Sequence, residues 1–389
     1  MGGARVLAPV IQALSRPPSG VTVMRSELNA ELRQALRDFV TAKLEPLAAE
    51  IDRTGEVPSA AVEVLREHGY LGMLLPAEYG GGGVDLATYC LTLEEFSRSH
   101  RVFTLLLDYS SGLAPLGILR FGTEAQRQRW IPDLVTGRAK GAFALTEPEA
   151  GSDSAAIRTR AELRDGRWVV NGRKHYISNG HDADVVLLVA VTDPAKRAHG
   201  GMTTFLVPSG TPGFTVTRVD TTIGSEAIKL GELTFEDCVL PEDAVLGSVG
   251  EGVRIAMGSL TSGRLGVSCS CIGAADRLLE MSIAHAKSRF TFGKPLAERQ
   301  AIQWMLADSE IDLQTARTYV YETLRRVMAG EEIGSAASIC KVVCSEMAGR
   351  VADHAVQIHG GMGLVRSYPV ERFYRDLSHY RVGEGSSEI

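Results

Sequence analysis

The spacing of apolar residues predicts a helical first third of the chain, a strand-rich centre and a long helical end. After Ser26, apolar residues recur at steps of three and four, as on one face of an amphipathic helix, at Leu28, Leu32, Leu36, Phe39, Val40 and Leu44. Ser26 is a suitable N-cap for that helix. The helical spacing resumes from Val84 after a run of glycines at 80–83, and Pro132 and Gly137 mark its end. We therefore predict an N-terminal helical domain over residues 25–140.

The centre of the chain, residues 141–248, changes to short runs of alternating or continuous apolar residues such as 167–170 and 185–191. Turn dipeptides separate these runs at Asp165-Gly166, Asn171-Gly172 and Asn179-Gly180. Such pairs suit tight hairpins because both positions tolerate positive φ. The pattern predicts a central antiparallel β domain, either a small sheet or a barrel.

Residues 249–389 return to long helical periodicity. One apolar stripe includes Leu260, Leu265, Ile272 and Leu279, a second runs from Ile302 to Val327, and a third helix is expected over 335–358. Long helices joined by short loops are typical of an antiparallel bundle. The fold class predicted is thus α+β and multidomain, with an N-terminal all-α domain, a central antiparallel β domain and a C-terminal four-helix bundle. Residues 1–24 are expected to be a disordered N-terminal segment.

Composition excludes several function classes. The chain has 389 residues and a net charge of −6 without a Lys/Arg stripe, which argues against nucleic-acid binding. No apolar run approaches the roughly 20 residues of a membrane span. The six cysteines form no C-x-x-C pair, and the histidines form no ligand cluster, so we predict reduced thiols and no metal site. The first 23 residues carry Arg5 and Arg16 but no acid; we predict a cytoplasmic location, with the mitochondrial matrix as the alternative.

Three polar or glycine-containing motifs are candidates for chemistry: residues 146–153, 357–363 and 384–389. In the first, the hydroxyls of Thr146 and Ser152 and the backbone N–H groups near Gly151 can bind the polar rim of a flavin or its pyrophosphate. Taken alone, the same segment is equally a capped loop. The glycines at 360 and 361 end a predicted helix, whereas a dinucleotide fold needs them between a strand and a helix. By themselves they indicate only a helix stop.

Taken together and in this order, the motifs resemble the acyl-CoA dehydrogenase family over nearly the whole chain. Residues 174–180 resemble that family's flavin-facing strand, which usually reads Trp-Ile-Thr-Asn-Gly. Tyr176 then takes the place of the aromatic residue that covers the flavin, and Ser178 that of the hydroxyl at its N5 edge. Residues 289–293 and Gln300 resemble the segment that binds the pyrophosphate and adenosine half of FAD from a neighbouring subunit, a role for which the arginine fork is suited.

The resemblance implies FAD as cofactor and a homo-oligomer, usually a homotetramer. Residues 357–361 would approach FAD across the subunit interface. The cofactor-binding residues it implies are Phe143, Leu145, Thr146, Gly151, Ser152, Tyr176, Ser178, Arg289, Phe292, Gln300, Gln357, Gly360, Gly361, Ser386 and Glu388.

The resemblance also places the catalytic base at Glu384. An acyl thioester's α proton is weakly acidic, so its removal needs a positioned carboxylate, and burial should raise the pKa of that carboxylate once a ligand excludes water. Some relatives carry the base on a bundle helix, one residue before an arginine. That position here is Gly263, before Arg264, so Glu384 is the only candidate that the family pattern offers.

Departures from the family pattern bear on the substrate. Gly383 replaces a bulky residue before the base, which would widen the cavity, and Ser367 replaces an acidic or amide residue. Asp108 and Tyr109 fall in the stretch that lines the acyl pocket of relatives and would give it a polar or shortened floor. We therefore expect a short, branched or oxygenated acyl group. The substrate-binding residues predicted are Ser152, Asp108, Tyr109, Arg264 and Gly385.

Alternative functions stay open from the sequence. The same chemistry can act on an acyl or aminoacyl group bound to a carrier protein in secondary metabolism instead of on acyl-CoA. A flavin monooxygenase on the same fold would not need Glu384, and a non-catalytic FAD-binding or DNA-protecting relative fits poorly with the acidic charge. The resemblance further implies an electron-transfer flavoprotein as the partner that reoxidises the enzyme.

Overall fold

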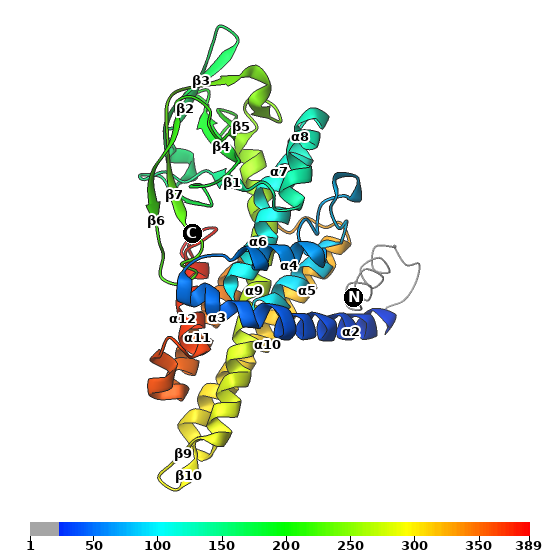
Figure 1. Cartoon of the computed structure of the whole chain (residues 1–389), viewed down its shortest axis with the longest axis vertical. Helices are drawn as coiled ribbons and strands as arrows, with labels where there is room; N and C mark the ends of the chain where they lie inside the picture. Colours follow the sequence, from blue (N-terminus) through cyan, green and yellow to red (C-terminus); the bar gives the residue numbers. More distant parts are fainter. Residues whose placement is uncertain (1–22) are drawn as a thin grey trace.

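The computed structural model describes residues 23–389, and side chains from residue 30 onward (Figure 1). Helix α2 (Val23–Phe39) continues through one π-helical turn (Val40–Leu44) into α3 (Glu45–Thr54). Since the helix begins at Val23, Ser26 lies inside it, and the predicted cap was wrong. The predicted apolar face is confirmed from residue 32 on, because these side chains are all buried: Leu32, Leu36, Phe39, Val40 and Leu44. The side chain of Leu28 lies outside the described residues.

The rest of the N-terminal region is helical, as predicted. Its elements are α4 (Ser59–Glu67), the 3₁₀ turn η2 (Ala77–Tyr79), α5 (Leu86–Phe96), α6 (Arg101–Ser111), α7 (Leu113–Phe121) and α8 (Glu124–Val135). The glycine run is sterically required, since a Cβ on Gly81 would lie 2.1 Å from the Leu75 carbonyl oxygen. Pro132 lies within α8 instead of ending it.

By length and composition alone, Arg101–Phe121 is apolar enough to cross a bilayer. Two thirds of that window is buried inside the fold, and Gly112 divides it into α6 and α7. Burial of this extent is typical of core helices, so the stretch is accounted for by packing.

The central region is one eight-stranded sheet. Its strands are β1 (Gly141–Ala144), β2 (Arg160–Arg164), β3 (Arg167–Ser178), β4 (Val185–Val191), β5 (Met202–Pro208), β6 (Phe214–Asp220), β7 (Leu230–Pro241) and β8 (Val245–Leu246). The order is β6-β7-β3-β2-β4-β5-β8, with β1 paired parallel to β4. Most neighbouring pairs are antiparallel, as predicted. Short 3₁₀ turns, η3 (Ser154–Ala156) and η4 (Glu242–Ala244), lie in its connections.

The three predicted hairpin turns have different outcomes. Asp165-Gly166 joins the antiparallel pair β2 and β3 with both φ angles positive, as predicted. Asn171-Gly172 was wrongly predicted as a turn: it is an irregularity inside β3, where the register on β7 shifts. A Cβ on Gly172 would lie 2.5 Å from Thr159 Oγ1, so glycine serves close packing there. Asn179-Gly180 ends β3 but connects strands that do not pair.

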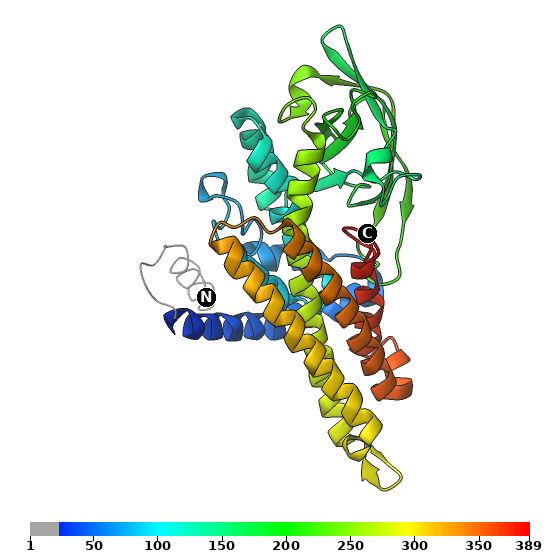
Figure 2. The same cartoon turned by 180° about the vertical axis from the view of Figure 1, so that it is seen from behind.

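The C-terminal region contains three long helices and one short one: α9 (Gly252–Ser288), α10 (Gln300–Met328), α11 (Gly334–His359) and α12 (Pro369–Ser378). Figures 1 and 2 show α9 running from the sheet to the tip of a long arm, with α10 returning beside it. A small hairpin, β9 (Phe290–Thr291) and β10 (Lys294–Pro295), and the turn η5 (Leu296–Glu298) form that tip. The turns η6 (Gly360–Leu364) and η7 (His379–Arg381) precede and follow α12.

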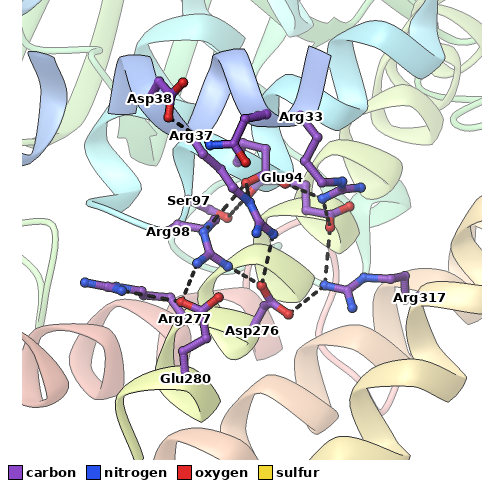
Figure 3. A network of polar contacts seen from close by, with 12 residues as sticks. Arg33, Arg37, Asp38, Glu94, Ser97, Arg98, Asp276, Arg277, Glu280 and Arg317 are labelled. Carbon is purple, nitrogen blue, oxygen red and sulfur yellow. Dashed lines mark hydrogen bonds and ion pairs between the residues drawn. The ribbon is translucent and has the colours of Figure 1, made fainter. Parts of the chain in front are cut away.

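The N-terminal helices and the bundle share one hydrophobic core that extends from Leu32 to Tyr380, while the sheet has its own. A network of ion pairs reinforces the junction of α2, α5, α9 and α10 (Figure 3). Glu94, almost fully buried on α5, accepts from Arg33 of α2 at 2.8 Å and from the Tyr321 hydroxyl of α10 at 2.5 Å. Arg317 of α10 lies 3.0 Å from Asp276 of α9 and 3.3 Å from Glu94. These contacts tie the start of the described chain to the bundle that positions the site.

Candidate active site

Glu384 lies in the turn after η7, directly against the middle of α9. A Cβ built on Gly263 would lie 2.6 Å from both carboxylate oxygens of Glu384. The backbone reaches this position through a left-handed conformation, with φ of 56° at Glu384 and 100° at Gly385. A non-glycine residue with positive φ is uncommon and is found where the surrounding structure enforces it. Residues 263 and 384 are the two positions at which members of the family carry the base, and they lie side by side. The Glu384 carboxylate occupies the space that a side chain at position 263 would fill.

Two cations hold the Glu384 turn by its backbone and leave the carboxylate free. Arg264 Nε donates to the Glu384 carbonyl at 3.3 Å, and its Nη1 donates to Ser338 Oγ at 2.9 Å. Lys341 Nζ donates to the carbonyls of Gly385 at 2.5 Å and Arg381 at 3.2 Å. Arg264 was predicted at the site, whereas Lys341 was missed. The sequence feature that could have identified Lys341 is its place among the apolar positions of the predicted helix. In the structure its side chain is almost fully buried on α11.

The surroundings of Glu384 favour its neutral form. Burial, followed by the nearby charge of Asp108, raises the pKa of Glu384 to about 8, although Arg264 and Lys341 lower it. Its Oε2 atom is shielded from solvent and has no hydrogen-bond partner. Burial raises the pKa of Asp108 to about 6. A carboxylate with a pKa near neutral pH is well matched to proton transfer from a weak carbon acid.

Asp108 and Tyr89 of the helical domain interact electrostatically with Glu384, and Tyr109 follows Asp108 in the chain. Asp108 and Tyr109 lie on α6, and Tyr89 lies on α5. The hydroxyls of Tyr89 and Tyr109 are buried without a hydrogen-bond partner. Burial, then the charge of Asp108, raises the pKa of Tyr89 well above its ordinary value, and Glu384 adds to this. The role of Asp108 and Tyr109 in an acyl pocket stays a prediction, and no sequence motif pointed to Tyr89.

The predicted flavin-side residues meet where β1 and β3 end. Phe143 belongs to β1, and Leu145 and Thr146 follow it. The Thr146 carbonyl accepts from the His175 backbone N–H at 2.9 Å, which sets this loop beside the end of β3. Tyr176, with φ of 58°, is 59% exposed and stacks on His175 at 3.8 Å between ring centroids. Ser178 is the last residue of β3.

Six other predicted cofactor residues fall in two places away from the sheet. Arg289, Phe292 and Gln300 lie at the arm tip, and Gln357, Gly360 and Gly361 lie at the end of α11. The stacking of His285 on His359 at 4.4 Å joins α9 and α11 near these two groups. Figure 1 shows the tip at the opposite end of the molecule from the sheet. Phe292 is 98% exposed there, so a single chain does not bring the predicted residues together.

The C-terminal residues Ser386 and Glu388 directly follow the Glu384 turn, with Ser386 half-buried and Glu388 exposed. Gly151 and Ser152 lie exposed in the loop after β1. Among residues 23–389 no group of His, Cys, Asp and Glu forms a metal site.

Models of the acyl-CoA dehydrogenase N-terminal, middle and C-terminal domains match residues 26–138, 142–238 and 250–389. An acyl-CoA dehydrogenase of Bacillus subtilis is 37% identical over 358 residues, which cover 92% of this chain and 94% of that protein. The chain belongs to the acyl-CoA dehydrogenase family. It is an FAD-dependent oxidoreductase that acts on CH–CH groups, and the three-region fold predicted from periodicity is the family fold.

Solved structures agree with the family assignment. Butyryl-CoA dehydrogenase of Megasphaera elsdenii superposes with a TM-score of 0.86 at 35% identity, covering 96% of this chain and 97% of that one. The prolyl acyl carrier protein oxidase AnaB superposes with a TM-score of 0.87 at 27% identity, covering 92% and 96% of the two chains. The family fold therefore serves enzymes with differently carried acyl groups.

The residues present fit FAD. A Cβ built on Gly151, Gly360 or Gly361 would meet no atom within 4 Å, so the backbone at these glycines is open to close approach by a ligand. Tyr176 offers an exposed aromatic ring, and Arg289 and Ser152 are exposed donors for phosphate oxygens.

Proposed function

We propose that this enzyme catalyses α,β-dehydrogenation of an acyl thioester, with Glu384 as the base that removes the α proton. The observation that carries the proposal is the Glu384 carboxylate, held against Gly263 by a turn whose carbonyls are bound by Arg264 and Lys341. Its unpartnered Oε2 and raised pKa suit a group that accepts a proton from carbon.

We assign the other residues of the site to positioning the Glu384 turn, stabilising the enolate oxygen and binding the cofactor. Arg264 and Gly385 keep the turn in place beside the thioester, and the Glu384 backbone N–H helps to hold the developing enolate oxygen. Tyr176 and Ser178 would hold the flavin ring when the cofactor is bound. FAD, when bound, supplies the acceptor for the hydride that leaves the β carbon. Phe143, Leu145, Thr146, Gly151 and Ser152 hold the isoalloxazine side of the cofactor, and Ser152 also faces the substrate.

A homotetramer completes the cofactor site in this proposal. Arg289, Phe292 and Gln300 at the arm tip, together with Gln357, Gly360 and Gly361, bind the pyrophosphate and adenosine half of FAD held mainly by a neighbouring subunit. Their separation from the sheet in one chain and the 98% exposure of Phe292 support this assignment. Ser386 and Glu388 are proposed to close the site from the C-terminal turn.

The substrate we propose is a short, branched or oxygenated acyl thioester. Asp108 and the unpartnered hydroxyls of Tyr89 and Tyr109 support an oxygenated acyl group, because buried polar groups without partners cost about 1–3 kcal/mol each and a hydroxyl or carbonyl on the substrate would satisfy them. A site built to hydrogen-bond a substrate group discriminates strongly against analogues that lack it. A turnover series that favours long straight chains would overturn this assignment.

We propose CoA as the carrier of the acyl group in the first instance. The likeness to the prolyl acyl carrier protein oxidase supports a second form, with an acyl or aminoacyl group on a carrier protein. Matched CoA and carrier-bound thioesters, compared by kcat/KM, decide between them. In either form an electron-transfer flavoprotein is proposed to take the electrons from the reduced enzyme.

Anaerobic mixing with an acyl thioester tests the reaction itself. The flavin absorbance near 450 nm should bleach rapidly in the wild-type enzyme, as expected for a reduced flavin. The Glu384→Gln variant should bind FAD normally and bleach about 100- to 10,000-fold more slowly, because general-base catalysis contributes that much. Unchanged bleaching in Glu384→Gln would rule out Glu384 as the base, and oxygen-dependent product hydroxylation would point to a monooxygenase.

A further inference from the structure

A fully buried ion pair joins strand β3 to the loop that follows β1. The side chain of Lys174 has no solvent exposure and that of Glu147 is 4% exposed, with Lys174 Nζ 2.8 Å from Glu147 Oε1. No motif in the sequence analysis gave either side chain a role. Buried charges are retained in a fold only where geometry and further hydrogen bonds compensate their desolvation.

Both ends of this pair make further hydrogen bonds within the same loop. Glu147 Oε1 also accepts from the Thr159 N–H at 2.9 Å, and Oε2 accepts from the Arg158 N–H at 2.6 Å. Lys174 Nζ donates in addition to the Leu145 carbonyl at 2.8 Å. Burial alone would raise the pKa of Glu147, but Lys174 and the N–H donors bring it below its ordinary value, so the carboxylate is ionised. The pair thus binds three separate points of the loop.

Thr146 lies between the two loop residues that Lys174 binds. Its own carbonyl accepts from the His175 N–H, and the Glu147 backbone closes a tight bridge with Ala150 at 3.0 and 3.2 Å. Tyr176 and Ser178 follow Lys174 on the same strand. The buried ammonium and the His175–Thr146 backbone bond therefore join the loop carrying Thr146 to the strand carrying Tyr176 and Ser178.

We propose that Glu147 and Lys174 are positioning residues for FAD, which fix Thr146 relative to Tyr176 and Ser178 before the cofactor binds. This inference rests on the cofactor roles in the proposed function. It adds two residues that touch no reacting atom and act through the loop geometry. Preorganisation of this kind lowers the entropy lost on ligand binding and so tightens it.

The test measures the dissociation constant of FAD for the apoenzyme by flavin fluorescence titration. Glu147→Gln keeps the size of the side chain but places an amide NH₂ against N–H donors, and Lys174→Met keeps the stem without the charge. Each should weaken FAD binding about 10- to 100-fold, the loss expected for one charge-assisted hydrogen-bonded group. The matched control is Glu149→Gln, two positions later in the same loop and exposed, which should bind FAD like the wild type.

Thermal melting of the same apoenzymes separates positioning from stability. If the variants melt earlier but bind FAD as tightly as Glu149→Gln, the pair is only structural and the proposal is overturned. If the variants do not fold, hydrogen exchange on the wild-type apoenzyme provides the test. The backbone amides of Arg158 and Thr159 should then exchange as slowly as those of β3. Fast exchange of these two amides would contradict the proposal. FAD titration needs no substrate, so its result does not depend on whether the enzyme dehydrogenates an acyl thioester.

Discussion

Glu384 combines a buried carboxylate, a strained backbone and an unpartnered oxygen in one residue. The protonated form cannot accept the substrate's α proton. We therefore expect kcat/KM to rise with pH through the acid range and to level off above an apparent pKa of about 8. The measurement is a pH profile of kcat/KM with one short acyl thioester, and a profile flat from pH 6 to 9 would contradict it.

Asp108 should shift that profile. Its negative charge is the largest electrostatic contribution that raises the pKa of Glu384, so Asp108→Asn should move the rise in kcat/KM to lower pH. The two carboxyls influence one another, and the profile then reports their combined titration. Tyr89→Phe, which removes a nearby hydroxyl but no acid, is the control and should leave the position of the rise closer to that of the wild type.

The raised pKa of Glu384 also predicts a stability effect. Because its folded pKa lies above the unfolded value, the stability it contributes is present below about pH 4.5 and is lost as pH rises through about 8. Glu384→Gln should therefore raise the Tm at pH 8 relative to the wild type, with no gain at pH 4. Equal Tm values of the two proteins at both pH values would contradict the burial of the charge.

At the scale of elements, α9 supports the base only because it carries glycine at 263. Gly263→Ala places a methyl group 2.6 Å from the Glu384 carboxylate and should displace it. A misplacement of about 1 Å lowers kcat about 100-fold. Gly258→Ala on the same helix is the matched control, because its Cβ would meet only Phe121 at 3.9 Å. Stopped-flow flavin reduction compares the two, and equal rates would show that the carboxylate does not depend on this space.

The junction of α2, α5 and α10 depends on the buried acid Glu94. Glu94→Gln removes the buried negative charge that Arg33, Arg317 and Tyr321 share and should lower the free energy of unfolding by about 3 kcal/mol. Glu162→Gln breaks an exposed ion pair with Arg164 on β2 and should lower the free energy of unfolding far less, because exposed ion pairs contribute little. Urea unfolding monitored by circular dichroism measures both, and equal losses would contradict the role of burial.

At the scale of the whole molecule, the split cofactor site predicts complementation between subunits. Arg289→Ala should weaken FAD binding at the neighbouring site, whereas Glu384→Gln disables the base within its own subunit. Hybrids of the two variants, formed by mixing and refolding or by co-expression, contain sites with both an intact arm tip and an intact base. Their activity per subunit at limiting FAD should exceed that of either parent oligomer. Activity no higher than that of the parents would place the whole cofactor site in one subunit.

The periodicity of apolar residues was sufficient to predict the three regions, because burial on one helix face or one sheet face repeats at fixed steps. It failed at Ser26 and Asn171-Gly172, where a cap and a turn are locally plausible but the helix and β3 continue through them. Short-range preferences of this kind are overridden when neighbouring elements supply better packing.

The sequence by itself determined the order of regions, the family motifs and the choice of Glu384, since each depends on residue type and spacing alone. Only the tertiary structure decided how these pieces meet. It placed Glu384 against Gly263, 121 positions away in the chain, and it supplied the burial that raises its pKa. It also paired Lys174 with Glu147 and bound Lys341 to the backbone of the Glu384 turn. Such contacts join residues far apart in sequence, and burial is a property of the packed chain that no local pattern contains.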